Sequence, residues 1–131
     1  MSKTRRISLA CLLLVAGLTA LPRSVEAHHG WADFDYASTV TFQGTVVDFH
    51  FTNPHCVVEF RVQDQKGKIT QWQGEFASPG ELSRKGWTAA TLQVGDKLTI
   101  SGHPSKNGGP AMHVSGIRLA SCKDLIVPES N

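Results

Sequence analysis

The chain has 131 residues, of which 40% are hydrophobic and only 18% charged, and its formal net charge is +2. Residues 1–27 contain four cations and one acid, a net charge of +3, so without them the +2 of the whole chain becomes −1. A chain of this length fits one compact domain and not two. Residues 28–131 contain no cluster of Lys and Arg, which disfavours nucleic-acid binding.

Residues 1–27 have the features of an export signal. Lys3, Arg5 and Arg6 precede an apolar run over residues 7–21 that is too short for a confident membrane span. Pro22 ends this run, and Val25-Glu26-Ala27 provides the small-x-small pattern of a cleavage site. We therefore expect cleavage after Ala27 and a periplasmic or secreted product with no membrane span. An uncleaved anchor or a buried helix is the alternative.

Two cysteines, Cys56 and Cys122, remain after the expected cleavage, because Cys11 belongs to the signal. In an oxidising compartment such a pair is a candidate disulfide. The bond would close a long loop and add roughly 3–5 kcal/mol in the chain-entropy model. Two free thiols, or sulfur ligands for copper, are the alternatives, and the spacing of the two residues does not decide between them.

The stretch from Val40 to Phe60 is rich in β-branched and aromatic residues and is interrupted by Thr52-Asn53-Pro54. This pattern predicts a strand, a tight turn and a second strand. We expect a bulge or sharp bend at Gly44. Beyond it, alternation places three apolar residues on one face of the first strand, and four on one face of the second: Val47, Phe49 and Phe51, then Cys56, Val58, Phe60 and Val62. Residues 28–39 show no clean periodicity and predict an extended segment that Trp31, Phe34 and Tyr36 hold on the domain.

The next elements are a hairpin and a short helix. The turn over residues 64–68 leads into a third strand over residues 69–76, in which Trp72, Gly74 and Phe76 share a face. A helix is predicted from Ser78 to Lys85, because Ser78 can cap it and Glu81 completes a capping box. Gly86 provides the residue at which the helix ends.

Two further strands are predicted over residues 97–102 and 111–119. The element order is then β-β-β-α-β-β, which predicts an all-β protein: a five-stranded OB-fold-like barrel over residues 40–122, with one short helix between strands 3 and 4. An open SH3-like barrel or a sandwich is the alternative. Residues 123–131 are predicted to be a flexible tail, in which residues 125–127 contact the domain.

Several short motifs occur together in this chain: His28-His29-Gly30-Trp31, Gly44-Thr45-Val46, Thr52-Asn53-Pro54-His55, Gly86-Trp87 and Leu92-x-x-Gly95-Asp96. In this combination the chain resembles a family of small exported bacterial proteins of unknown function. The family usually has serine at the position of Gly30 and an aliphatic residue at that of Cys56. The resemblance implies export and a small β-barrel, and it implies no activity, so function must be argued from the residues themselves.

All six histidines follow the expected cleavage site, and neither an HExxH helix motif nor a CxxC pair is present, so zinc-protease and zinc-ribbon sites lack support. Cleavage after Ala27 would give His28 a free α-amine beside its own imidazole. Imidazole ligands suit copper, and an amine with a pKa of about 7.7–8.0 can be deprotonated to bind it. We predict that His28 binds copper with one partner from His55, His103 or His113, and that Met112 adds a soft ligand for the reduced ion. The alternative is that the histidines never converge.

No catalytic motif is present. The Gly-x-Ser-x-Gly nucleophile elbow is absent, and the acidic residues show no spacing typical of a glycosidase. The chain is therefore predicted to be a non-enzymatic binding protein for a metal ion, with copper as the candidate, or for a small ligand. The alternative is a periplasmic interaction or structural domain without metal, which docks a partner protein through an exposed apolar patch including Trp31 or Phe51.

Overall fold

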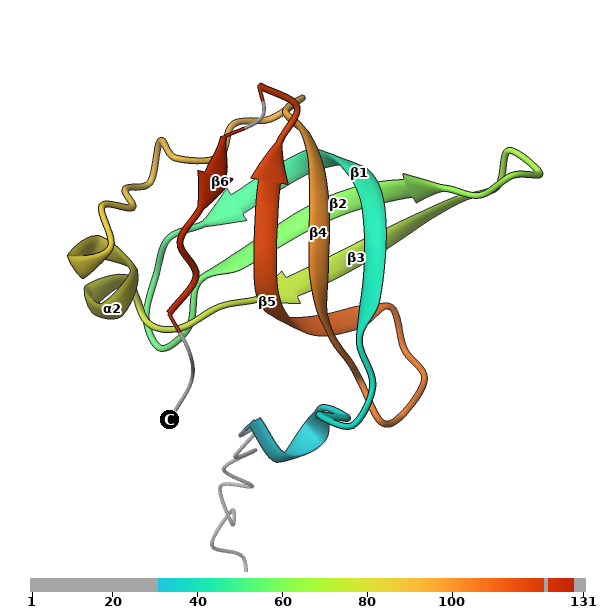
Figure 1. Cartoon of the computed structure of the whole chain (residues 1–131), viewed down its shortest axis with the longest axis horizontal. Helices are drawn as coiled ribbons and strands as arrows, with labels where there is room; N and C mark the ends of the chain where they lie inside the picture. Colours follow the sequence, from blue (N-terminus) through green and yellow to red (C-terminus); the bar gives the residue numbers. More distant parts are fainter. Residues whose placement is uncertain (1–30, 122, 129–131) are drawn as a thin grey trace, which may run out of the picture.

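Five strands rich in β-branched and aromatic residues close into a barrel, and a short helix lies between the third and the fourth, as the sequence predicts (Figure 1). The computed structural model describes residues 31–121 and 123–128. In chain order the elements are η1 (Trp31–Asp33), β1 (Val40–His50), β2 (Val57–Gln63), β3 (Ile69–Glu75), α2 (Pro79–Arg84), β4 (Lys97–Pro104), β5 (Ala111–Leu119) and β6 (Asp124–Leu125). Within these residues, no helix is long and apolar enough to cross a membrane.

The long strand β1 belongs to both halves of the barrel. Its first half pairs with β4 as far as Thr45↔Lys97, and its second half pairs with β2 from Thr45↔Arg61 onward. The β2–β3 and β4–β5 pairs are antiparallel, and a parallel pairing of β3 with β5 closes the barrel. This closed arrangement is the predicted OB-fold-like barrel and excludes the open alternatives.

The core follows the alternation predicted for β2 and β3. Val58 and Phe60 point into the barrel and are fully buried, as is Phe76 just after β3. Gly74 is needed among them, because a Cβ there would lie only 2.8 Å from a methyl group of Val114. Strand β3 therefore approaches β5 closely enough to close the barrel.

The alternation predicted for β1 is wrong at one point. The register shifts between Val46 and Asp48, so the bulge lies near Val47 and not at Gly44. A bulge adds one residue to a strand and reverses which side chains face inward. Val46 is therefore buried at 2% exposure, whereas Val47 is only partly buried. Gly44 instead permits close packing, since a Cβ there would lie 2.9 Å from the Phe60 ring.

The helix forms as its capping residues predict. The Ser78 hydroxyl accepts a hydrogen bond from the Glu81 N–H, and the Glu81 carboxylate accepts one from the Ser78 N–H. Gly86, with φ of +85°, follows the last turn, and Leu82 is fully buried against the barrel. A helix of six residues is stable here because it is capped at its start and packed through this apolar residue.

The segment predicted to be a flexible tail is partly built into the fold. Strand β6 pairs with β5 through Ile117↔Leu125, and Leu125 and Val127 pack against the core. The indole N–H of Trp87 donates a 2.8 Å hydrogen bond to the Ile126 carbonyl. Residues 124–127 therefore pack on the barrel, because Asp124 and Leu125 add a short strand beside Ile117 and Arg118, beyond the part of β5 that pairs with β3.

Candidate functional site

Two of the predicted ligands, His103 and His113, lie side by side at one end of the barrel. They are direct partners in the β4–β5 pairing, and their rings stack with centroids 6.4 Å apart. The antiparallel register brings them together, since residues at paired positions share a face of the sheet. Ten positions separate them in sequence, and the loop after Pro104 returns the chain to the same level.

The segment before β1 covers this histidine pair. Phe34 is buried at 7% exposure and forms an isolated β-bridge with Ser105, so it holds the segment on the barrel as predicted. The Tyr36 hydroxyl lies 3.2 Å from Nδ1 of His113, and the Tyr36 ring centroid lies 4.8 Å from that of His103. A pocket of about 370 Å³ opens beside these three rings, lined also by Val114, Ser115, Val127 and Pro128.

The two histidines differ in environment. Burial, together with the nearby charges of His103 and then His55, lowers the pKa of His113 from 6.5 to about 4. His113 is therefore neutral at physiological pH, as a metal ligand must be. His103 is more exposed, and its Nδ1 lies 2.8 Å from the Ser38 carbonyl oxygen. Because a carbonyl only accepts, this Nδ1 carries a proton, and in the neutral ring Nε2 then holds the lone pair.

His55 lies on the outer side of the same barrel end. Its Nδ1 is 2.5 Å from a carboxylate oxygen of Glu75, and Glu75 is the pairing partner of His113 across β3 and β5. A carboxylate on one ring nitrogen orients an imidazole and raises its basicity, which is the usual support of a metal ligand. The outer face therefore carries a row across β3, β5 and β4: Glu75, which holds His55, then His113 and His103.

The structure brings together some of the predicted ligands only. Within residues 31–121 and 123–128, no three His, Cys, Asp or Glu side chains are placed to hold a metal ion. His28 lies outside the described residues, so its part in the predicted site stays a prediction. Met112 is fully buried in the core, although it neighbours His113 in sequence, because adjacent strand residues face opposite ways. This burial excludes Met112 as the predicted soft ligand.

The side chain of Cys56 is fully buried and forms no disulfide within the described residues. Burial raises its pKa to about 11, against a small opposite effect of a hydrogen bond from the Thr52 backbone. The thiol is therefore protonated and unreactive in the fold. Its predicted disulfide partner Cys122 lies outside the described residues, so their pairing stays a prediction.

A family model, described as a family of unknown function (DUF6152), matches residues 16–113. The chain belongs to this family. The match covers more than half of the 131 residues and agrees with the resemblance that the sequence motifs indicate. No curated protein matches the chain.

The match to the DUF6152 family ends at His113. It therefore includes all three histidines of the row on the outer face, His55, His103 and His113. The sequence pattern did not reveal the part that Tyr36 plays there, since its role was predicted to be structural only. The symmetry of His103 and His113 about the loop between β4 and β5 was the signal that could have paired them. An antiparallel hairpin centred near Gly108 places these two positions opposite each other.

A separate group of polar side chains lies on β1 and β2 of this DUF6152 barrel. His50 Nε2 is 3.6 Å from Asp48 and 3.5 Å from Glu59, and Gln71 donates a 2.8 Å hydrogen bond to Glu59. Asp48 and Glu59 are cross-strand neighbours, so two carboxylates face each other. His50 lies between them and offsets their repulsion when it is protonated, which explains the group without a ligand.

Proposed function

We propose that this protein is an exported, non-enzymatic binding domain that holds a copper ion between its mature N-terminal residue, His28, and the His103–His113 pair. The observation that supports this function is the cross-strand pairing of His103 and His113 beneath the segment that leads back to the N-terminus. Two adjacent imidazoles are a partial copper site, and an N-terminal histidine offers an amine and a third imidazole.

Chain connectivity keeps His28 within reach of the pair. The segment before β1, here called the lead-in segment (residues 31–39), is fixed beside His103. The Asp35 N–H donates a 2.8 Å hydrogen bond to the Pro104 carbonyl, and Phe34 forms a β-bridge with Ser105. His28 lies three positions before η1, and this connection spans at most about 10 Å when it is fully extended. The N-terminal residue can therefore fold back over the pocket beside the two rings.

The hydrogen bonding of His103 favours it as the first partner. Its Nδ1–H donates to the Ser38 carbonyl, which leaves the Nε2 lone pair for a metal. His113 contributes from a site where burial keeps the ring neutral, and His55 is held by Glu75 further along the row. We therefore rank His103 before His113 and His55 as the imidazole that completes the site with His28.

A titration of metal-free residues 28–131 with Cu(II) tests this function. We expect one ion per chain, and we expect either one added alanine before His28 or the substitution His103→Ala to weaken binding at least about tenfold. The matched control is His50→Ala, since His50 is also a surface histidine near carboxylates but lies outside the row. Unchanged affinity in both altered proteins would contradict the proposal.

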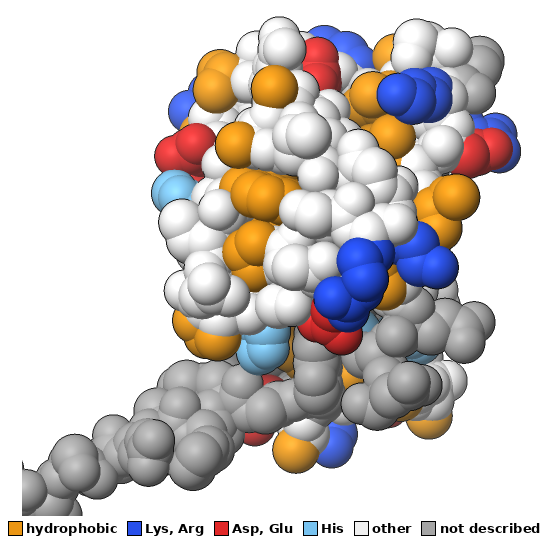
Figure 2. All heavy atoms as spheres, turned by 90° about the vertical axis from the view of Figure 1, so that its left-hand side faces the viewer, with side chains coloured by type: hydrophobic (Ala, Val, Ile, Leu, Met, Phe, Trp, Pro, Cys, Tyr) orange, Lys and Arg blue, Asp and Glu red, His pale blue; other side chains and the backbone are white. Residues whose placement is uncertain are grey.

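The alternative of a metal-free docking domain has less support. Phe51, which the sequence offered for an apolar docking patch, is partly buried and packs against the core. The large apolar side chains that are exposed within the described residues are Tyr36, Ile69, Val94 and Ile126. Figure 2 shows apolar groups on the face carrying α2 as small areas bordered by polar surface. No observation on that face therefore favours a large apolar interface.

A further inference from the structure

A second polar site lies on the outer face of β4, β1 and β2, where three pairing partners form one row. Thr45 on β1 pairs with Lys97 on β4 on one side and with Arg61 on β2 on the other. Neighbouring strands are about 4.8 Å apart, so the backbones of the two cationic residues are separated by about 10 Å with a hydroxyl between them. The Lys97 ammonium is drawn toward this centre, because it donates a 2.6 Å hydrogen bond to the Thr45 hydroxyl.

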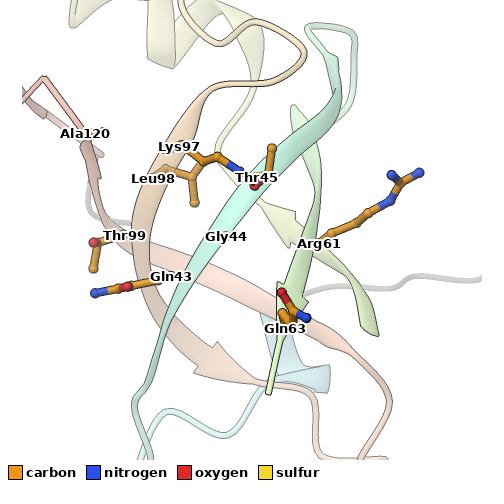
Figure 3. A pocket seen from close by; sticks show the side chains of 9 residues that line it. All are labelled: Gln43, Gly44, Thr45, Arg61, Gln63, Lys97, Leu98, Thr99 and Ala120. Atoms are coloured by element: carbon orange, nitrogen blue, oxygen red, sulfur yellow. Dashed lines mark hydrogen bonds between the residues drawn. The ribbon is translucent and has the colours of Figure 1, made fainter. Parts of the chain in front are cut away.

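The row lies in a concave part of the surface. A pocket of about 540 Å³ is lined by residues of this row and their neighbours on the same strands, Gln43, Gln63 and Thr99 (Figure 3). In Figure 3 the Lys97 side chain reaches from β4 across to Thr45 on β1, whereas the Arg61 side chain extends from β2 away from Thr45. The lining offers ammonium, guanidinium, hydroxyl and amide groups but no carboxylate.

Neither cation is neutralised within the described part of the chain. No carboxylate lies within 4.0 Å of the Lys97 ammonium or the Arg61 guanidinium there, whereas Arg118 pairs with Asp124 at 2.6 Å. A carboxylate or phosphate group matches this charge, since it can accept charge-assisted hydrogen bonds from Lys97 and Thr45 and from Arg61 once the flexible Arg61 side chain turns inward. Lys97, Thr45 and Arg61 therefore have the chemistry of an anion-binding site.

An apolar wall continues this site on one side. A second pocket of about 460 Å³ shares Thr45, Arg61 and Lys97 with the first, and it is also lined by Ile69 and Val94. Ile69 and Val94 are 60% and 75% exposed, so two of the large apolar side chains left uncovered in the described residues meet beside the cations. An anion alone would not cover them, but an aliphatic chain attached to the anion would.

We propose that this groove binds a small amphiphile, with its carboxylate or phosphate head on Lys97, Thr45 and Arg61 and its aliphatic chain over Ile69 and Val94. The two connected hollows have the volume of small-molecule sites, which is about 300–1,000 Å³. The hollow shape favours a single small ligand over a membrane surface, because two cations alone would hold an anionic membrane only weakly. The proposal is independent of the copper site, since the two share no residue.

Titration calorimetry of residues 28–131 tests the proposal with decyl phosphate below its micellar concentration, with inorganic phosphate and with a neutral decyl glycoside. We expect decyl phosphate to bind most tightly, Lys97→Gln to weaken it about tenfold by removing a charge-assisted hydrogen bond, and Ile69→Ser to weaken it while leaving phosphate binding unchanged. Arg84→Gln on α2 and Lys85→Gln are the matched controls and should change neither. Circular dichroism of each variant verifies that the barrel is folded.

Three results would overturn the proposal. Equal affinity for decyl phosphate and inorganic phosphate would show that the apolar wall takes no part. Equal affinity for the neutral glycoside would show that the cations take no part. Binding to phosphatidylglycerol vesicles without binding to monomeric decyl phosphate would show a membrane-surface contact in place of a single-ligand site.

Discussion

His103 and His113 stack across the β4–β5 pair at 6.4 Å, and only one of the two is buried. The covered ring, His113, also has His55 and Glu75 beside it on the β3 side and Tyr36 above it from the lead-in segment. A positive charge on His113 would lose its hydration and meet a second imidazole. The pair therefore links the stability of this barrel end to pH and, under the proposed function, to metal.

The first prediction concerns pH. The pKa of His113 is lowered from 6.5 to about 4 in the fold, so between these values the unfolded chain binds more protons and stability falls as the pH falls. The full stabilisation is present above pH 6.5, and this residue accounts for a loss of about 3 kcal/mol by pH 4. Urea unfolding at pH 7.0 and pH 5.0 with a chelator present measures the slope.

The variant His113→Gln provides the comparison, because glutamine does not titrate in this range. We expect its free energy of unfolding to depend less on pH than that of the original protein over the same interval. An equal slope in both proteins would mean that other groups cause the pH dependence and that His113 titrates normally.

The second prediction concerns metal and stability. An ion that binds only the folded chain stabilises it by about 2.7 kcal/mol at a free concentration one hundred times its dissociation constant. We expect Cu(II) to raise the midpoint of thermal unfolding of residues 28–131, and EDTA to reverse the rise. His103→Ala should reduce the rise to about half or less, because its binding is at least about tenfold weaker, and His50→Ala should retain it. A rise of equal size in both variants would place the metal elsewhere.

The sequence predicts most of the barrel because its local signals agree with one another. Ser78, Glu81 and Gly86 mark the helix, and alternation marks β2 and β3, where each inward residue is apolar. Which side chains of β1 point into the core could not be predicted in the same way, because an alternation of period two assumes a strand without a bulge. The bulge near Val47 depends on how β1 curves from β4 to β2, which is a property of the closed barrel.

The candidate sites depend even more on pairing register. Lys97 and Arg61 are far apart in sequence and form no basic cluster there, yet both are pairing partners of Thr45. His103 and His113 likewise meet through the β4–β5 register. Residue types alone indicated which side chains can bind metal, but the distances between strands decide which of them act together.

The third prediction concerns the close approach of β4 and β5 at Gly102, opposite His113. A Cβ added at Gly102 would lie 2.3 Å from the His113 carbonyl oxygen and 2.9 Å from the Met112 sulfur. Since the carbonyl belongs to the backbone, the strands must separate, and we expect Gly102→Ala to cost about 3 kcal/mol in the free energy of unfolding. Chemical denaturation measures it.

Gly80→Ala is the matched control for this substitution. Gly80 lies in α2, where an added Cβ meets no atom within 4 Å. Alanine is favoured over glycine in a helix, so we expect this variant to be more stable by up to about 1 kcal/mol. Equal effects of the two substitutions would contradict the close approach of the strands at Gly102.

The fourth prediction concerns the thiol of Cys56. Because burial raises its pKa to about 11, only about a thousandth of the thiol is ionised at pH 8 in the fold. We expect iodoacetamide to leave Cys56 of the native protein unmodified and to alkylate it rapidly in urea. Labelling in urea without reductant would show a free thiol, whereas labelling only after reduction would show the predicted disulfide with Cys122. Rapid alkylation of the native protein would contradict the burial that raises the pKa.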